Sequence, residues 1–123
     1  MIEERKYDLE DRLIKFTVMI ANLAETLADT MFGRYMGGQL IRSASSPALN
    51  YGEAKSAESL NDFIHKMKIC LKELRETFVS LRIIKEKPLV KETEMLSSCL
   101  KECTELISIF VKSIQTSEKR KLK

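Results

Sequence analysis

Apolar residues spaced alternately four and three positions apart constrain this chain most strongly, because only a helix gathers such positions on one side. Three stretches of the 123-residue sequence carry this pattern. The first consists of Leu9, Leu13, Phe16, Ile20, Leu23 and Leu27. The second consists of Leu60, Ile64, Met67, Leu71, Leu74, Phe78 and Leu81. The third consists of Leu96, Leu100, Cys103, Ile107, Phe110 and Ile114. Periodicity alone therefore predicts three amphipathic helices.

Capping and helix-breaking residues indicate where these helices end. Gly33 is a natural C-terminal cap for the first helix, which we expect to stop within residues 30–32. Ser59 can cap the helix of the second stretch at its N-terminus. Pro88 ends that helix, because the residue before a proline is pushed out of the helical region. The last helix should then start within residues 89–93.

A further helix is expected over residues 35–54, although its apolar pattern is weaker. Pro47 falls in its middle, where it lacks a backbone donor and clashes with the preceding turn, so we expect a kink or a local break. Several small side chains around this proline would let a neighbouring helix approach closely. They are Ser43, Ala44, Ser45, Ser46 and Ala48.

Four helices with short connections, each with one apolar stripe, pack most economically when all the stripes face one axis. The composition agrees, since 44% of the residues are hydrophobic and few are aromatic. We therefore predict an all-α fold, an antiparallel up-down-up-down left-handed four-helix bundle, over residues 1–115. Residues 116–123 lack an apolar face and should form a basic, frayed C-terminal tail.

The net charge of +3 is distributed unevenly along the chain. Residues 1–30 carry four basic and seven acidic side chains, whereas residues 59–123 carry fourteen basic and nine acidic ones. A basic surface attracts phosphate, although a solvated helix face rich in lysine has the same composition. Possible nucleic-acid contacts are Lys66, Lys68, Arg75, Arg82, Lys119, Arg120, Lys121 and Lys123. Aromatic residues are not interleaved with them, which argues against sequence-specific single-strand recognition.

The sequence offers little for catalysis or for metal binding. His65 is the only histidine, and it has no identifiable nucleophile or orienting partner. No Glu-x-x-His pair of the di-metal bundle proteins is present. Cys99 and Cys103 could supply half of a metal site, with only Cys70 and His65 to complete it, but buried thiols packing as small hydrophobic groups fit the pattern better. We expect no enzyme, no cofactor and no metal.

Cysteine usage and the N-terminus bear on the cellular compartment. Three cysteines, an odd number without a CxxC pair, do not form a secreted disulfide framework and suit a reducing cytoplasm. The first six residues are largely charged and lack the apolar run of a signal peptide. We therefore expect a cytoplasmic protein without a membrane segment.

Polar residues at helical spacing stand out in the second helix and have potential partners in the third. The set consists of Arg42, Ser46, Asn50 and Glu53, with Lys72, Glu73 and Glu76 as the partners. Such a set favours a buried or subunit-bridging network that fixes helix register, because acidic groups are available for Arg42. A ligand or nucleic-acid contact is the alternative.

These polar residues belong to a segment with a recognisable order. The motif Arg42-Ser43-x-x-Ser46-x-x-x-Asn50-Tyr51-x-Glu53-Ala54, followed by Asp62-Phe63-Ile64-x-Lys66 and by Lys72-Glu73-x-x-Glu76-Thr77, resembles the 23S ribosomal RNA intervening-sequence proteins. The resemblance implies a four-helix bundle that assembles as a homopentamer and shares the seven polar residues named above. A related branch, the accessory proteins of diversity-generating retroelements, forms basic pentamers that bind nucleic acid and a reverse transcriptase.

Two functional hypotheses follow from these observations. The first is a non-enzymatic, self-assembling bundle that binds RNA or DNA, or a nucleic-acid-processing protein, through a basic face of its third and fourth helices. The second is a protein-interaction and oligomerisation scaffold with no nucleic-acid role, in which the polar network and the spare apolar surface serve only assembly.

Overall fold

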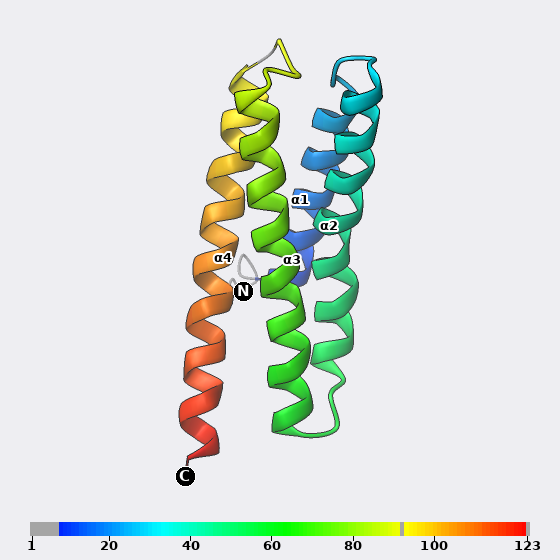
Figure 1. Ribbon diagram of the computed structural model, residues 1–123. Helices are drawn as coiled ribbons and strands as arrows, with labels where there is room; N and C mark the ends of the chain where they lie inside the picture. Colours follow the sequence, from blue (N-terminus) through cyan, green and yellow to red (C-terminus); the bar gives the residue numbers. More distant parts are fainter. Residues whose placement is uncertain (1–7, 92, 123) are drawn as a thin grey trace, which may run out of the picture.

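The computed structural model describes residues 8–91 and 93–122 and contains four helices (Figure 1). They are α1 (Leu9–Ala24), α2 (Met31–Lys55), α3 (Leu60–Glu86) and α4 (Thr93–Lys121). The described part of the chain contains no strand. The predicted all-α four-helix bundle is therefore confirmed, whereas its left-handed sense stays a prediction.

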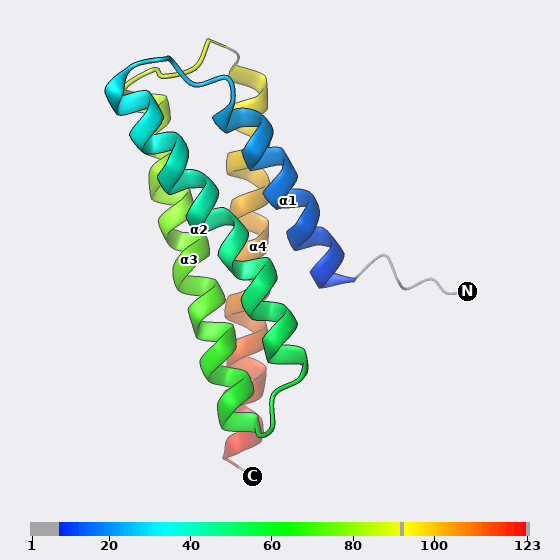
Figure 2. The same cartoon turned by 90° about the vertical axis from the view of Figure 1, so that its right-hand side faces the viewer.

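The connections lie at alternating ends of the bundle, as Figures 1 and 2 show. At one end, the backbone N–H of Ala28 in the α1–α2 connection donates to the carbonyl oxygen of Leu89 in the α3–α4 connection, at 2.8 Å. This bond ties together two connections that are far apart in the sequence.

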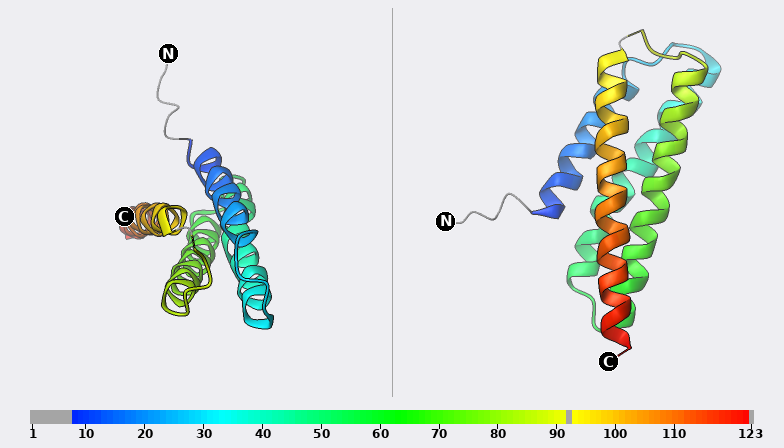
Figure 3. Two further views of the ribbon diagram at one scale, coloured as in Figure 1. Left: turned by 90° about the horizontal axis from the view of Figure 1, so that it is seen from above. Right: turned by 90° about the vertical axis from the view of Figure 1, so that its left-hand side faces the viewer.

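The shortest helix, α1, diverges from α4 toward its own N-terminus (Figure 3). Side-chain pairs span the widening gap. The Arg12 guanidinium binds both carboxylate oxygens of Glu102, at 2.7 and 3.0 Å, and also Glu105 at 2.7 Å, which raises the pKa of Arg12. On the other side, Lys55 of α2 pairs with Glu10 at 2.7 Å. These contacts hold the first turns of α1 against the bundle.

The three periodic stretches supply the core as expected. Fully buried side chains come from every helix, the largest being Phe16 of α1 and Phe110 of α4. The rings of Phe110 and Tyr51 pack edge to face at a centroid distance of 6.1 Å. Burying each such side chain contributes about 1.5–3 kcal/mol, so this shared interior is the main stabilising term of the bundle.

The end of α1 differs from the expectation. The helix stops at Ala24, not within residues 30–32, and α2 begins directly after Thr30, whose side chain accepts from the N–H of Gly33 at 3.0 Å. Gly33 therefore lies in the first turn of α2 and does not cap α1. A Cβ at this position would lie 1.9 Å from the Ala28 carbonyl oxygen, so the glycine is required by a close backbone approach.

The predictions for the ends of α3 and for Pro47 in α2 had different outcomes. Ser59 caps α3, accepting from the N–H of Asp62 at 3.0 Å, and α3 ends at Glu86, so both predicted ends are confirmed. At Pro47 we expected a kink or a local break. No break occurs, since α2 continues through this residue, and the proline side chain is buried. Packing against the core outweighs the unfavourable helix propensity of proline.

The expected frayed tail is also wrong for the residues that are described. The helix α4 continues to Lys121, and Ser117 within it is buried. Lys68 of α3 pairs with Glu118 at 3.0 Å, which adds a tertiary contact that the apolar pattern could not reveal. Lys123 lies outside the described residues.

The three cysteines are buried thiols. Burial raises the pKa of Cys70 and of Cys103 to about 12, and that of Cys99 to about 11, so all three stay neutral at physiological pH. The thiol of Cys103 donates to the Leu74 carbonyl oxygen at 3.3 Å. Within the described residues, no three His, Cys, Asp or Glu side chains come together as metal ligands would.

None of the helices in the described ranges is both long and apolar enough to cross a bilayer.

A buried hydrogen bond joins α2 to α3. The hydroxyls of Ser43 and Thr77 lie 2.8 Å apart, and both side chains are almost completely buried. Each hydroxyl also lies near a carbonyl oxygen of its own helix, Thr77 at 2.9 Å from Glu73 and Ser43 at 3.4 Å from Leu40, so either hydroxyl can donate in the bond between the helices. The small Ser43 side chain allows this close approach.

Replacement of Thr77 by valine keeps the shape of the side chain but removes the hydroxyl that is hydrogen-bonded to Ser43. We expect the free energy of unfolding to fall by about 1–2 kcal/mol, because a buried hydroxyl loses its best partner. Urea denaturation followed by circular dichroism measures the change. Thr104→Val is the matched control, since the Thr104 hydroxyl also donates to a carbonyl in its own helix but is exposed. Equal changes in the two variants would contradict the proposed role of the bond.

Candidate functional site

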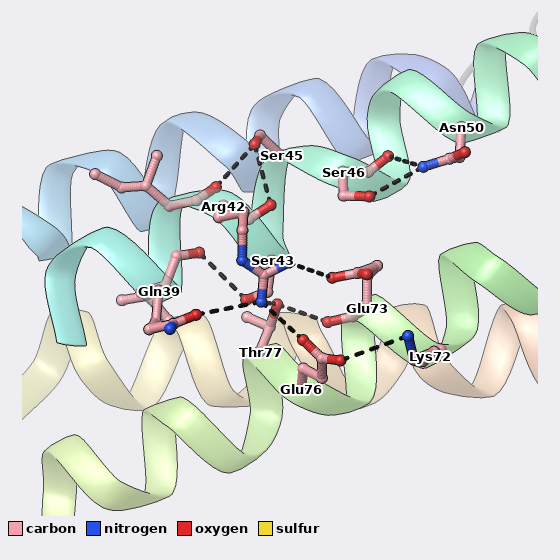
Figure 4. Close-up of polar contacts among 12 residues, drawn as sticks. Gln39, Arg42, Ser43, Ser45, Ser46, Asn50, Lys72, Glu73, Glu76 and Thr77 are labelled. Carbon is pink, nitrogen blue, oxygen red and sulfur yellow. Dashed lines mark hydrogen bonds and ion pairs between the residues drawn. The ribbon is translucent and has the colours of Figure 1, made fainter. Parts of the chain in front are cut away.

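Arg42 is the centre of an ion-pair network between α2 and α3 (Figure 4). Its Nη1 lies 3.2 Å from a carboxylate oxygen of Glu73, and its Nη2 lies 2.9 Å from one of Glu76. The same Nη2 donates to the side-chain oxygen of Gln39 at 3.3 Å. Lys72 approaches the second oxygen of Glu76 at 4.0 Å. One guanidinium thus bridges two successive turns of α3.

The two ends of this network differ in their exposure to water. The Glu73 side chain is 12% exposed, whereas that of Arg42 is 56% exposed. A carboxylate that is almost buried depends on its counter-charge, because little water remains to solvate it. On the open side, the hydrogen bond to Glu76 is the main cause of the raised pKa of Arg42. The network therefore ties a surface arginine to the edge of the core.

The predicted polar set does not form one continuous network. Arg42, Lys72, Glu73 and Glu76 come together as expected. Asn50 instead donates to the carbonyl and the hydroxyl oxygens of Ser46, both at 3.0 Å, within α2 (Figure 4).

Glu53 forms a third, separate group. It pairs with Lys66 of α3 near the α2–α3 connection. The spacing of the seven predicted residues located them on one side of α2 and α3, but it could not decide which of them touch.

Next to Arg42, an open groove of about 750 Å³ runs between α2 and α3. Its lining residues are Tyr35, Met36, Gln39, Arg42, Ser43, Lys68, Leu71, Lys72, Arg75, Glu76, Val79, Ser80 and Ile83. A second hollow shares Val79 and Ile83 with the groove and adds Phe32, Arg82, Glu86 and Lys87. We call the two together the α2–α3 groove.

The predicted basic contacts separate into paired and unpaired cations. Lys66, Lys68 and Lys121 each have a carboxylate within 4.0 Å. In the ranges that the structure covers, Arg75 and Arg82 on α3 have no ion-pair partner, and neither do Lys119 and Arg120 on α4. Lys123 is outside those ranges.

The unpaired cations lie in two places. Arg75 and Arg82 line the α2–α3 groove. Arg120 lines a different hollow, beside Phe63 and Lys112. The predicted basic face is thus divided, and its α3 part coincides with the groove.

Sequence reasoning missed Gln39 and Tyr35, although both follow from the helical repeat. They lie three and seven positions before Arg42, on the same side of α2. Gln39 also donates from its side-chain nitrogen to the Tyr35 hydroxyl at 3.0 Å. The network therefore extends along α2 to an exposed aromatic ring.

The fold and this site together define a small four-helix bundle protein with an ion-pair network across two helices. Residues 5–112 match the 23S rRNA-intervening sequence protein family, so the chain belongs to that family. The resemblance of its central motif is thereby confirmed. A relation to the retroelement accessory proteins stays a prediction.

A solved structure is also similar to this chain. It is that of a protein of unknown function from the S23 ribosomal protein family of Bacteroides thetaiotaomicron VPI-5482. The TM-score is 0.77 at 31% sequence identity, and the match covers 85% of this chain and 96% of the other. The comparison with curated proteins gave no match.

Replacement of Arg42 by alanine removes the counter-charge of Glu73. We expect a lower urea midpoint than in the wild type, and Glu73→Gln added to Arg42→Ala should recover part of the loss, because the uncompensated charge is then gone. The matched control is Arg34→Ala, since Arg34 also lies on α2 but pairs with the fully exposed Asp29. Denaturation of the wild type, the two single variants Arg42→Ala and Glu73→Gln, their double variant and the control measures the coupling, and strictly additive effects of the two substitutions would contradict it.

Proposed function

We propose that this chain is a non-enzymatic, self-assembling helical bundle of the cytoplasm that binds nucleic acid, or a nucleic-acid-processing protein, through the basic side chains of α3 and α4. The observation that carries the proposal is the position of Arg75 and Arg82, two cations without a carboxylate partner in the described ranges that line the α2–α3 groove. Unpaired guanidinium groups are suited to phosphate, which they can bind in a bidentate manner.

The spacing of the cations on α3 supports this proposal. Lys68, Lys72, Arg75 and Arg82 follow one another at intervals of four, three and seven, so they lie on one stripe of the helix. At ~1.5 Å per residue the stripe from Lys68 to Arg82 is about 21 Å long. The family name refers to an RNA, which agrees with a phosphate-bearing partner but does not identify it.

Titration of a fluorescently labelled, structured RNA at several salt concentrations tests the proposal. We expect binding that weakens with salt, and the double variant Arg75→Gln/Arg82→Gln should reduce the slope of log affinity against log salt by about 1.5, because two phosphate contacts are lost. Lys15→Gln, which removes an exposed charge from α1, outside the proposed surface, is the control and should leave the slope almost unchanged. Absence of binding at low salt, or binding without a salt slope, would refute the proposal.

The second candidate function is an oligomerisation scaffold, and a separate observation favours it. Large apolar side chains are exposed on α1 and α2, among them Ile14, Val18, Ile41 and Leu49. Exposed apolar residues on neighbouring helices are typical of subunit contacts. The family resemblance implies that the assembly is a homopentamer, and we adopt this as the proposed state.

Sedimentation velocity tests the assembly through a charge placed on this surface. Val18 is 53% exposed, so Val18→Asp should fold normally yet shift the protein from the oligomer toward the monomer, because the carboxylate would be desolvated in the contact. Ser108→Asp adds the same charge to an exposed position of α4 and should leave the oligomer intact. A wild-type protein that sediments as a monomer at micromolar concentration would exclude this function.

A further inference from the structure

Exposed aromatic rings lie beside the basic stripe of α3, although the two are far apart in the sequence. Tyr35, which is 58% exposed, lines the α2–α3 groove together with Lys72 and Arg75. Phe32 lines the adjoining hollow together with Arg82. The two rings stack at a centroid distance of 6.4 Å and an angle of 22° between their planes. The fold thus interleaves aromatic and basic groups that the sequence keeps separate.

A chain of hydrogen bonds along α2 restrains the Tyr35 ring. Gln39 donates to its hydroxyl, and Gln39 in turn accepts from Arg42, whose carboxylate partners are on α3. A ring fixed in this way offers a flat apolar surface at little cost in conformational entropy. Leu71, Val79 and Ile83 of α3 continue this apolar surface along the groove.

Charge complementarity selects the occupant of the groove. Glu76, an acidic side chain in its lining, is already neutralised by Arg42 and Lys72. The lining also contains Glu86, but its six basic side chains outnumber the two acidic ones, so its formal charge is positive. Arg75 and Arg82 are the guanidinium groups of this lining that have no ion-pair partner within the described residues. A partner must combine flat apolar groups with anionic groups, and unpaired nucleotides provide both.

We infer that the α2–α3 groove binds single-stranded nucleic acid, with bases stacked on Tyr35 and Phe32 and with phosphates on Arg75 and Arg82. This inference rests on the proposed function and narrows it from nucleic acid in general to an unpaired strand. In a duplex the base faces are stacked inside the helix, so a duplex would engage the cations but leave the aromatic rings unused. The length of the basic stripe suits a strand of a few nucleotides.

Fluorescence anisotropy with two probes separates the stacking contribution from the charge contribution. The probes are a labelled oligouridine of about 16 nucleotides and an RNA duplex of the same length. Tyr35→Ala should weaken oligouridine binding about tenfold and leave duplex binding unchanged, because base stacking is lost. Tyr35→Phe keeps the ring but loses the hydrogen bond from Gln39, so it should bind oligouridine much more tightly than Tyr35→Ala does and no more tightly than the wild type. Arg75→Gln should weaken the binding of both probes.

Three results would overturn the inference. They are an unchanged affinity of Tyr35→Ala for oligouridine, an equal loss for both probes in that variant, and a wild-type preference for the duplex. Each of these results leaves salt-dependent binding of nucleic acid intact, so it contradicts the single-strand site but not the proposed function. An acidic amphipathic helix of a protein then becomes the next occupant of the groove to test. If neither probe binds with a salt slope, the proposed function itself fails.

Crosslinking gives an independent readout on the wild-type protein. Oligouridine that contains 4-thiouridine, irradiated in the complex, should attach to the peptide that carries Phe32 and Tyr35. Attachment confined to the C-terminal part of α4, around Arg120, would overturn the assignment of the strand to the groove.

Discussion

The hydrogen bond between the buried hydroxyls of Ser43 and Thr77, at 2.8 Å, fixes one point of the register in which α2 packs against α3. In that register Arg42 lies above Glu73 and Glu76, and Tyr35 faces the basic stripe of α3. A shift by one residue would turn each of these side chains by about 100° around its helix and separate the pairs. The ion-pair network and the groove thus require the same register of α2 and α3 as this hydrogen bond does.

The extent of the helices could be predicted where it depends on apolar spacing and local caps. The α3 helix is the clearest case, since its stripe, its Ser59 cap and its end before Pro88 are all visible in the sequence. The end of α1 could not be predicted, because Leu27 continues the spacing although it lies beyond the helix. Gly33 fits either a helix end or a helix start, and only the approach of the Ala28 carbonyl decides between them.

The candidate site was predictable in part. Arg42 and its acidic partners were found because an arginine at a helical interval from other polar groups needs a counter-charge, and α3 supplies carboxylates at the matching spacing. The separation of Ser46 and Asn50 into a local pair could not be foreseen, since their spacing of four allows Asn50 to bond within α2 as well as to reach toward α3. The association of Phe32 and Tyr35 with Arg75 and Arg82 likewise arises only when α2 and α3 are brought together in space.

Family membership supports the assignment of the fold more than it supports any assignment of function. The match over residues 5–112 and the similarity to a solved structure agree with a common bundle, and neither identifies a ligand. The α2–α3 groove is therefore the feature on which the proposed binding of nucleic acid depends.

The hydrogen bond from Ala28 to Leu89 shows that the bundle consists of two helical hairpins joined at one end. It connects the hairpin α1–α2 to the hairpin α3–α4 at the end of the bundle where the α1–α2 and α3–α4 connections lie. At the opposite end the hairpins are joined by the connection between α2 and α3, while the start of α1 is held by side chains such as Arg12. We therefore expect local opening of the bundle to begin at this corner, because α1 is the shortest helix and side-chain pairs hold its first turns there.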